Sequence, residues 1–186
     1  MNLQKLFEMQ RQLDERIEEE HPRQEGEDRL AKKILALQVE LGELANEARF
    51  FKYWSHDQEP RIKQPIYCRK CDGDGCYKCD DKGIVGYKNP LLEEYVDCLH
   101  FILSIGLELD FTDIDVWKVK EATTTNQFIE CFGTIYNMHF QKRVNGEVPR
   151  EIYEHLFACF IGLGEMLGFT WSEIEQAYLE KNQVNH

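Results

Sequence analysis

The amino-acid sequence predicts an all-α protein, a helical bundle of about five to six helices that carries a small cysteine-rich insertion. Three observations predict this fold. Apolar residues recur at steps of three and four over most of the 186 residues, which is the period of an amphipathic helix. The pattern stops between Ser55 and Asn89, where proline, glycine and cysteine are frequent. Two acidic pairs with helical spacing lie on either side of this interruption.

The composition indicates one globular domain. Hydrophobic residues make up 42% of the chain and aromatic residues 12%, as in proteins with a packed core. We therefore expect residues 1–186 to form a single domain, with residues 60–88 as an inserted module. The formal net charge of −12 argues against nucleic acid as a partner, because binding to a phosphate backbone requires a basic surface.

The sequence also bears on location. No apolar run reaches the roughly 20 residues that a membrane span requires. The N-terminus is rich in acids and glutamines, where a signal peptide would carry an apolar run. Four of the seven cysteines are crowded between Cys68 and Cys79, which suits metal binding in a reducing compartment. These features predict a cytoplasmic protein without a membrane partner.

The first half of the chain predicts three helices. The first spans residues 2–20 and has Gln10 inside its apolar face, where an amide needs hydrogen-bond partners. The second runs from Asp28, a helix cap, to about residue 54, and it ends in an aromatic cluster containing Lys52 and Trp54. That cluster is either core packing or a wall and an anion contact for a nucleotide. Pro90 suits the first turn of the third helix, which extends to about residue 109.

The second half predicts a fourth helix over residues 125–143 and a fifth over residues 149–167. A last short helix follows, with Ser172 as its cap and Glu175 as the capping-box partner. The lysine and asparagines of residues 177–186 either bind a phosphate or a base edge, or belong to a frayed end. The fourth helix is expected to face inward through Phe128, Phe132, Ile135, Tyr136 and His139.

The two acidic pairs are Glu40 with Glu43 and Glu94 with Asp97. Each pair has its members three residues apart in a helix that is otherwise strongly apolar. Carboxylates with restricted access to water need a cation or a hydrogen-bond donor. Four such oxygen ligands favour Mg²⁺, or Mn²⁺, with water positions left for a phosphate-bearing substrate. The alternative is that these are ordinary acids on a helix surface.

A histidine follows the second acidic pair at helical spacing. His100 lies three residues after Asp97, and the resulting E-x2-D-x2-H series raises a di-iron carboxylate site as an alternative. The first acidic helix has Asn46 where a matching histidine would be required. We therefore interpret His100 as a packed residue, or as one that contacts the metal ligands without binding the metal itself.

The cysteines of the insertion are arranged as C-x2-C-x4-C-x2-C, and they are Cys68, Cys71, Cys76 and Cys79. Paired CxxC motifs with glycines for the tight turns are typical of a closed tetrahedral zinc site, which is structural because no ligand position stays open. A redox pair is the alternative. The first half of this segment also resembles the zinc knuckle of DnaJ-type chaperones, which implies a knuckle and not a chaperone.

Motifs spread along the whole chain resemble those of the dimeric all-α dUTPases, members of the all-α NTP pyrophosphatase superfamily, whose pattern is ExxE followed by ExxD. The matching segments are Glu8–Asp14, Glu40–Glu47, Phe51–Trp54, Glu94–Asp97 and Tyr178–Asn182. The cysteine module is a departure, because the family pattern does not require it.

The resemblance implies a homodimer that hydrolyses dUTP to dUMP and pyrophosphate, with water attacking the α-phosphate. It implies that Glu40, Glu43, Glu94 and Asp97 bind Mg²⁺ and that one of the two α-helical glutamates of the first pair holds the water. It also implies a set of substrate-binding residues: Gln10, Asn46, Trp54, Tyr178, Lys181, Asn182 and Asn185. Lys52 is added to this set as the candidate anion contact of the aromatic cluster. Two alternatives stay open: a pyrophosphatase for another non-standard nucleotide, and a non-catalytic zinc-stabilised interaction module.

Overall fold

A computed structural model describes residues 2–184 and consists of six helices and one two-stranded hairpin in that range. The predicted all-α fold with a four-cysteine insertion is confirmed. The elements, in chain order, are α1 (Leu3–Glu20), α2 (Arg29–Ala48), β1 (Gln64–Tyr67), β2 (Ile84–Lys88), α3 (Pro90–Glu108), α4 (Thr124–Asn145), α5 (Arg150–Met166) and α6 (Trp171–Val184).

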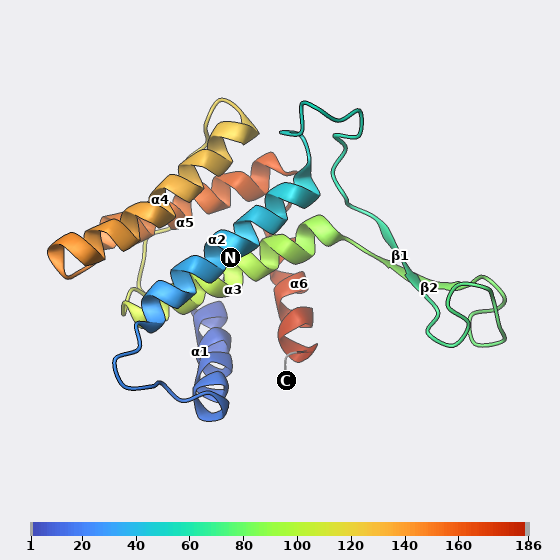
Figure 1. The fold of residues 1–186 in the computed structure, drawn as a ribbon, viewed down its shortest axis with the longest axis horizontal. Helices are drawn as coiled ribbons and strands as arrows, with labels where there is room; N and C mark the ends of the chain where they lie inside the picture. Colours follow the sequence, from blue (N-terminus) through green and yellow to red (C-terminus); the bar gives the residue numbers. More distant parts are fainter. Residues whose placement is uncertain (1, 185–186) are drawn as a thin grey trace.

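Two helix pairs form the centre of the molecule. Helix α2 packs along α3, and α4 packs along α5, with α2 also contacting α4 (Figure 1). Helices α1 and α6 both lie against α3 (Figure 1). The buried apolar side chains of all six helices join into one hydrophobic core. Helix α3 is therefore surrounded on most sides, which explains its almost continuous apolar sequence.

A tyrosine and a glycine fix the contact between α3 and α5. The hydroxyl group of Tyr95 on α3 donates a hydrogen bond to the carbonyl oxygen of Phe160 on α5, at 2.9 Å, and the two rings stack at 4.2 Å. Gly164 lies one turn further along α5, where a Cβ atom would be 2.5 Å from the Tyr95 hydroxyl oxygen. A glycine is required there because only its backbone leaves room for the ring.

A second tyrosine and glycine make the equivalent contact from α5 to α3. Tyr153 on α5 donates to the carbonyl oxygen of Ile102 on α3, at 3.0 Å. Gly106 lies one turn beyond Ile102, and a Cβ atom there would be 2.2 Å from the Tyr153 hydroxyl oxygen. In both helices the tyrosine precedes the glycine by the same number of residues. The two helices therefore hold each other through equivalent contacts.

The boundaries of α2 and α3 test the sequence predictions. The side chain of Asp28 caps α2 by accepting a hydrogen bond from the backbone N–H of Ala31, at 2.9 Å, and α3 begins at Pro90, both as predicted. The predicted end of α2 near residue 54 is wrong. The helix ends at Ala48 because Arg49 adopts a left-handed conformation, with φ of 64°, and turns follow.

The predicted cap of α6 is also wrong. The capping box is formed by Thr170 and Glu173, two residues before the predicted Ser172 and Glu175. The hydroxyl oxygen of Thr170 accepts a hydrogen bond from the backbone N–H of Glu173, while the Glu173 carboxylate accepts one from the backbone N–H of Thr170 at 2.8 Å.

One residue of α4 also differs from the sequence prediction. Tyr136, expected to face inward, is 58% exposed.

The cysteine-rich insertion is a hairpin that projects from the bundle (Figure 1). Strands β1 and β2 are antiparallel, and Gln64 pairs with Lys88 at the end nearest the helices. The root is fastened by backbone hydrogen bonds from Arg61 N–H to the Glu47 carbonyl oxygen, at 2.9 Å, and from Leu91 N–H to the Arg61 carbonyl oxygen, at 3.0 Å. The hairpin therefore leaves and rejoins the bundle at one place.

Within residues 2–184, no single helix is both long and apolar enough to cross a membrane. Helices α5 and α6 meet that criterion of length and composition only when taken together, across a bend of 106°.

Candidate active site

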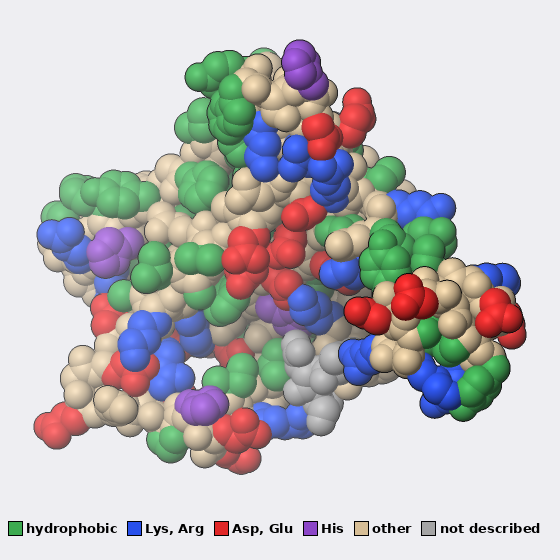
Figure 2. Space-filling model, turned by 45° about the vertical axis from the view of Figure 1, so that its right-hand side comes forward, with side chains coloured by type: hydrophobic (Ala, Val, Ile, Leu, Met, Phe, Trp, Pro, Cys, Tyr) green, Lys and Arg blue, Asp and Glu red, His purple; other side chains and the backbone are tan. Residues whose placement is uncertain are grey.

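The packing of α2 against α3 brings acidic side chains from both helices together. Glu40 and Glu43 come from α2 and Glu94 from α3, and one carboxylate oxygen of each lies within 4.8 Å of the others. Acidic side chains gather near the centre of the face shown in Figure 2. Spacings of three residues put each pair on one side of its helix, so the packing of two helices is enough to form the cluster.

The carboxylates repel one another. Burial, followed by the charges of Asp97, Glu43 and Glu40, raises the pKa of Glu94 to about 7. Burial and the charges of Asp97 and Glu43 likewise raise the pKa of Glu40. Burial also raises the pKa of Asp97, although its hydrogen bond and charge pair with Lys181 act in the opposite direction. These side chains therefore share one negative potential, which a cation would relieve.

Helix α6 is joined to α3 by two contacts beside this cluster. The ammonium group of Lys181 pairs with Oδ2 of Asp97. One turn away, the ring of Tyr178 stacks on the ring of His100, with centroids 4.2 Å apart. Because Tyr178 and Lys181 are three residues apart, as are Asp97 and His100, one face of each helix makes both contacts. The C-terminal segment is therefore helical through Val184, with Tyr178 and Asn182 buried, and the frayed-end interpretation is wrong for residues 177–183.

Gln10 connects α1 to both of these helices. Its side-chain N–H group donates to Oδ1 of Asp14 at 2.7 Å, so its carbonyl oxygen Oε1 points the other way. There it accepts from the Tyr178 hydroxyl and from His100 Nδ1, each at 2.8 Å. His100 must therefore carry its proton on Nδ1, and its buried Nε2 is an acceptor without a partner among the described residues. Burial, with the charge of Lys181, lowers the pKa of His100 to about 4.

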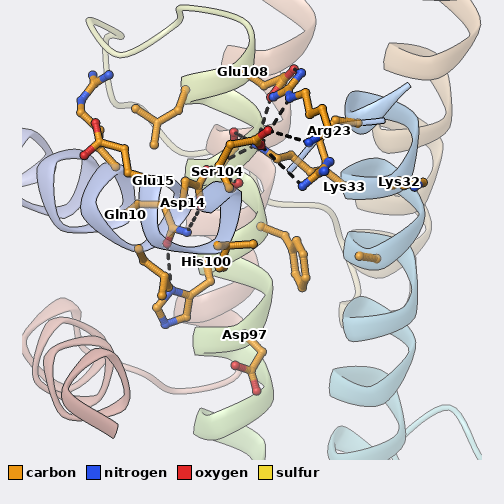
Figure 3. Close-up of a pocket in the computed structure, with 18 residues that line it drawn as sticks. Gln10, Asp14, Glu15, Arg23, Lys32, Lys33, Asp97, His100, Ser104 and Glu108 are labelled. Carbon is orange, nitrogen blue, oxygen red and sulfur yellow. Dashed lines mark hydrogen bonds and ion pairs between the residues drawn. The ribbon is translucent and has the colours of Figure 1, made fainter. Parts of the chain in front are cut away.

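A cavity of about 770 Å³ adjoins this network between α1, α2 and α3. Figure 3 shows Gln10, His100 and Asp97 toward one end and charged side chains toward the other. At the charged end, Lys33 pairs with Asp14 at 3.3 Å and with Glu108 at 3.1 Å. The cavity reaches the acidic cluster through Asp97, so a ligand in it would extend toward the carboxylates.

Other residues proposed from the sequence lie outside this network. Asn46 is exposed, and its backbone carbonyl oxygen accepts a hydrogen bond from the Lys52 ammonium group at 3.4 Å. Trp54 is 66% exposed and packs edge-to-face on Phe51, with ring centroids 5.9 Å apart. The structure thus brings the acids, Gln10, Tyr178 and Lys181 together, whereas Asn46, Lys52 and Trp54 lie on or after the end of α2.

Two of the proposed substrate-binding residues are asparagines of the C-terminal segment, Asn182 and Asn185. Asn182 is buried, and its Oδ1 has no hydrogen-bond partner among residues 2–184. A buried acceptor of this kind needs a donor, which a ligand can supply. Asn185 lies outside the described residues.

Sequence reasoning missed part of this site. Ser104 on α3 donates to Oδ2 of Asp14 at 2.5 Å, and Lys33 on α2 binds the same oxygen. Ser104 follows His100 by four residues in an apolar helix, a spacing that could have marked it. Nothing local distinguishes Lys33 from a surface lysine. The di-iron alternative is not favoured, because Nδ1 of His100 faces Gln10. The group of ligand atoms within 4.8 Å of one another consists of Glu40, Glu43 and Glu94, and Asp97 lies beside it, paired with Lys181.

The four cysteines of the hairpin converge at its tip. The Sγ atoms of Cys68 and Cys76 are 3.8 Å apart, as are those of Cys71 and Cys79, and Cys76 and Cys79 are separated by 3.9 Å. The edge of a tetrahedron with Zn–S bonds of about 2.3 Å is about 3.8 Å long. The spacing of the thiols therefore fits one tetrahedral zinc ion.

Comparison with known proteins identified a family for this chain. A family model described as dUTPase matches residues 2–66 and 76–186 of this chain. Residues 67–75, which contain Cys68 and Cys71, fall outside the matched ranges. Both acidic pairs and α6 fall inside them. The comparison with curated proteins gave no match.

Proposed function

The chain belongs to the all-α dUTPase family, and from that membership we propose that it hydrolyses dUTP to dUMP and pyrophosphate with the help of Mg²⁺. The observation that carries the proposal is the convergence of Glu40, Glu43 and Glu94 from two helices onto one space beside Asp97. The fallback substrate is another non-standard deoxynucleoside triphosphate.

The donor set suits a hard divalent cation. All four groups offer carboxylate oxygen, the ligand that Mg²⁺ prefers, and Mn²⁺ accepts the same ligands. Burial, followed by the charges of neighbouring carboxylates, raises the pKa values of Glu40, Glu94 and Asp97, and Lys181 alone does not offset these effects. When bound, the ion would acidify a coordinated water and neutralise phosphate charge.

The residues of the chain then have separate tasks. One of the two glutamates of α2, Glu40 or Glu43, holds the attacking water and accepts its proton. The water oxygen forms a bond to the α-phosphorus as the bond to the bridging oxygen breaks, and pyrophosphate leaves. Lys181 is placed by its pairing with Asp97 to offset the charge that develops on the leaving group. We also assign Asn185 to phosphate binding, on the family resemblance alone.

Recognition of the nucleoside is proposed for the network around Gln10. The unpaired acceptors His100 Nε2 and Asn182 Oδ1 suit a ligand that presents an N–H donor, as the uracil ring does. Tyr178 holds Gln10 and stacks on His100, so it positions both. Asn46, Lys52 and Trp54 would reach the nucleotide only if the segment after α2 moves inward, because Trp54 is mostly exposed.

For the hairpin we propose one structural zinc ion held by the thiolates of Cys68, Cys71, Cys76 and Cys79. The spacing of the sulfur atoms fits a tetrahedron, and the four ligands leave no open position. The zinc would therefore hold the turns of the tip together and take no part in hydrolysis.

We also propose that the protein is a homodimer, as its family membership leads us to expect, and that α4 lies in the interface. This helix carries four large apolar side chains that are each between 44% and 63% exposed: Ile129, Tyr136, Phe140 and Val144. Their spacing puts them on one face of α4. Such a face is normally covered by another surface.

The proposal is tested by measuring pyrophosphate release from each dNTP and NTP in the presence and absence of Mg²⁺. We expect release from dUTP that requires Mg²⁺, and loss of at least about 100-fold in kcat for Glu43→Gln. Glu93→Gln is the matched control, because Glu93 pairs with Lys88 at 2.8 Å instead of joining the cluster. No pyrophosphate release from any nucleotide would favour the non-catalytic interaction module.

A further inference from the structure

A second group of metal-ligating side chains lies between α4 and α5, in the half of the molecule that the proposed hydrolysis does not use. Glu130 comes from α4, and His155 and Cys159 come from successive turns of α5. Oε1 of Glu130 is 2.9 Å from Nε2 of His155, and Sγ of Cys159 is 3.4 Å from the same nitrogen. One ligand atom from each residue lies within 4.8 Å of the others.

The geometry points to a metal site, and we propose that Glu130, His155 and Cys159 bind one Zn²⁺ ion. In a catalytic Cys–His–acid triad the thiol and the acid use different nitrogens of the imidazole ring. Here both face Nε2, so the ring cannot relay a proton between them. Burial, with the charge of Glu130, also raises the pKa of Cys159 to about 12, which is the opposite of an activated thiol.

The separations fit the ligand shell of zinc. Bond lengths of about 2.3 Å to sulfur and about 2.0 Å to nitrogen give a tetrahedral S···N edge of about 3.5 Å. The distance between Cys159 Sγ and His155 Nε2 is 3.4 Å. The corresponding N···O edge is about 3.3 Å, so the Glu130 carboxylate must move away from His155 by a few tenths of an ångström. Glu130 is not fully buried and can make this movement.

The three ligands leave one side of the site open. A cavity of about 340 Å³ adjoins Glu130 and His155 and is also lined by Thr134, Asn137 and Glu151. A water molecule, or the Glu151 carboxylate after a side-chain rotation, can supply the fourth ligand from this cavity. The mixture of thiolate, imidazole and carboxylate selects zinc over Mg²⁺, so the ion of the proposed catalytic centre does not compete for it.

Zinc content tests the proposal. Tag-free protein is loaded with Zn²⁺, passed through a desalting column and analysed for zinc per chain. We expect two zinc ions in the wild type, one in the hairpin and one here, and one in the His155→Gln variant. His56→Gln, which removes an exposed histidine elsewhere, should retain two. An unchanged zinc content in His155→Gln would overturn the proposal, because all bound zinc would then belong to other groups.

A second measurement separates this site from the hairpin and does not depend on zinc retention. In a variant with all four hairpin cysteines changed to serine, Co²⁺ should still give a thiolate-to-metal charge-transfer band. Adding Cys159→Ala should remove the band, whereas adding Cys98→Ala should leave it. A four-serine variant that keeps its helical circular dichroism and gives no such band would also overturn the proposal.

Discussion

The ammonium group of Lys181 on α6 lies against Oδ2 of Asp97 on α3. This contact attaches the C-terminal helix to the acidic cluster, where Lys181 is the cation paired with a carboxylate proposed as a magnesium ligand. The same oxygen cannot serve both Lys181 and a metal ion fully. Binding of Mg²⁺ should therefore loosen the contact and leave Lys181 able to turn toward a phosphate.

Replacement of Lys181 is expected to strengthen Mg²⁺ binding and to slow turnover. Lys181→Met should tighten Mg²⁺ binding in the absence of nucleotide by about fivefold, since a partly exposed ion pair contributes about 1 kcal/mol. The same variant should lower kcat by about tenfold or more, because charge on the leaving group is no longer offset. Calorimetric titration and pyrophosphate release measure the two effects. Lys120→Met, which removes a cation paired with Glu165, is the control; weaker Mg²⁺ binding in Lys181→Met would contradict the prediction.

His100 should make the stability of the protein depend on pH. Its pKa is lowered from 6.5 to about 4, mainly by burial, so between these values the unfolded chain binds a proton that the folded protein does not. Stability is therefore fully present above pH 6.5 and is lost as the pH falls toward 4. The loss between pH 7 and pH 5 should be about 2 kcal/mol.

Urea unfolding of the wild type and of His100→Gln at the two pH values measures this contribution. All other titrating groups are common to both proteins, so the difference between them isolates His100. We expect the variant to lose about 2 kcal/mol less than the wild type on moving from pH 7 to pH 5. Equal losses in the two proteins would mean that His100 is not held neutral by burial.

Gly164 should not tolerate a side chain. A Cβ atom there would lie 2.5 Å from the hydroxyl oxygen and 2.8 Å from Cζ of Tyr95, whose ring is stacked on Phe160 and cannot move freely. Gly164→Ala is expected to lower the free energy of unfolding by about 1–3 kcal/mol. Gly133→Ala on α4 meets no heavy atom within 4 Å and should be neutral or stabilising by up to about 1 kcal/mol. The midpoint of urea unfolding measures both, and equal effects would contradict the prediction.

The hairpin should be removable. Because Gln64 pairs with Lys88, a two-residue Asn-Gly turn can replace residues 65–87 without separating the ends. We expect this variant to keep its helical circular dichroism and to hydrolyse dUTP within about threefold of the wild-type rate, since the proposed site lies on the helices. It should lose one zinc ion per chain. Loss of helical content would show that the hairpin supports the bundle.

Periodicity and local chemistry were sufficient to predict most of the fold. The starts of α2 and α3 follow from Asp28 and Pro90, whose effects involve only the next few residues. The end of α2 could not be predicted this way, because Arg49 is a residue that normally continues a helix and the turn depends on its surroundings. Periodicity also places Tyr136 in the core, although it is exposed, because an exposed apolar face has the same period as a buried one.

The acidic cluster was accessible to sequence reasoning because it needs only two helices with short spacings. The network around Gln10 was not, since Gln10 and Tyr178 are 168 residues apart and meet only when α1 and α6 both pack on α3. The pairing of Lys181 with Asp97 depends on the same tertiary packing. Contacts between elements distant in sequence leave no periodic trace, so only the structure reveals them.

The equivalent tyrosine and glycine contacts of α3 and α5 have a consequence for ancestry. Tandem duplication of one ancestral helical hairpin would produce two such pairs, α2 with α3 and α4 with α5, that hold each other in the same way. When Tyr95 is aligned with Tyr153, His155 falls at the position of Asp97 and Ile152 at the position of Glu94. One copy would then have kept its acids, while the other was free to acquire a softer set of ligands.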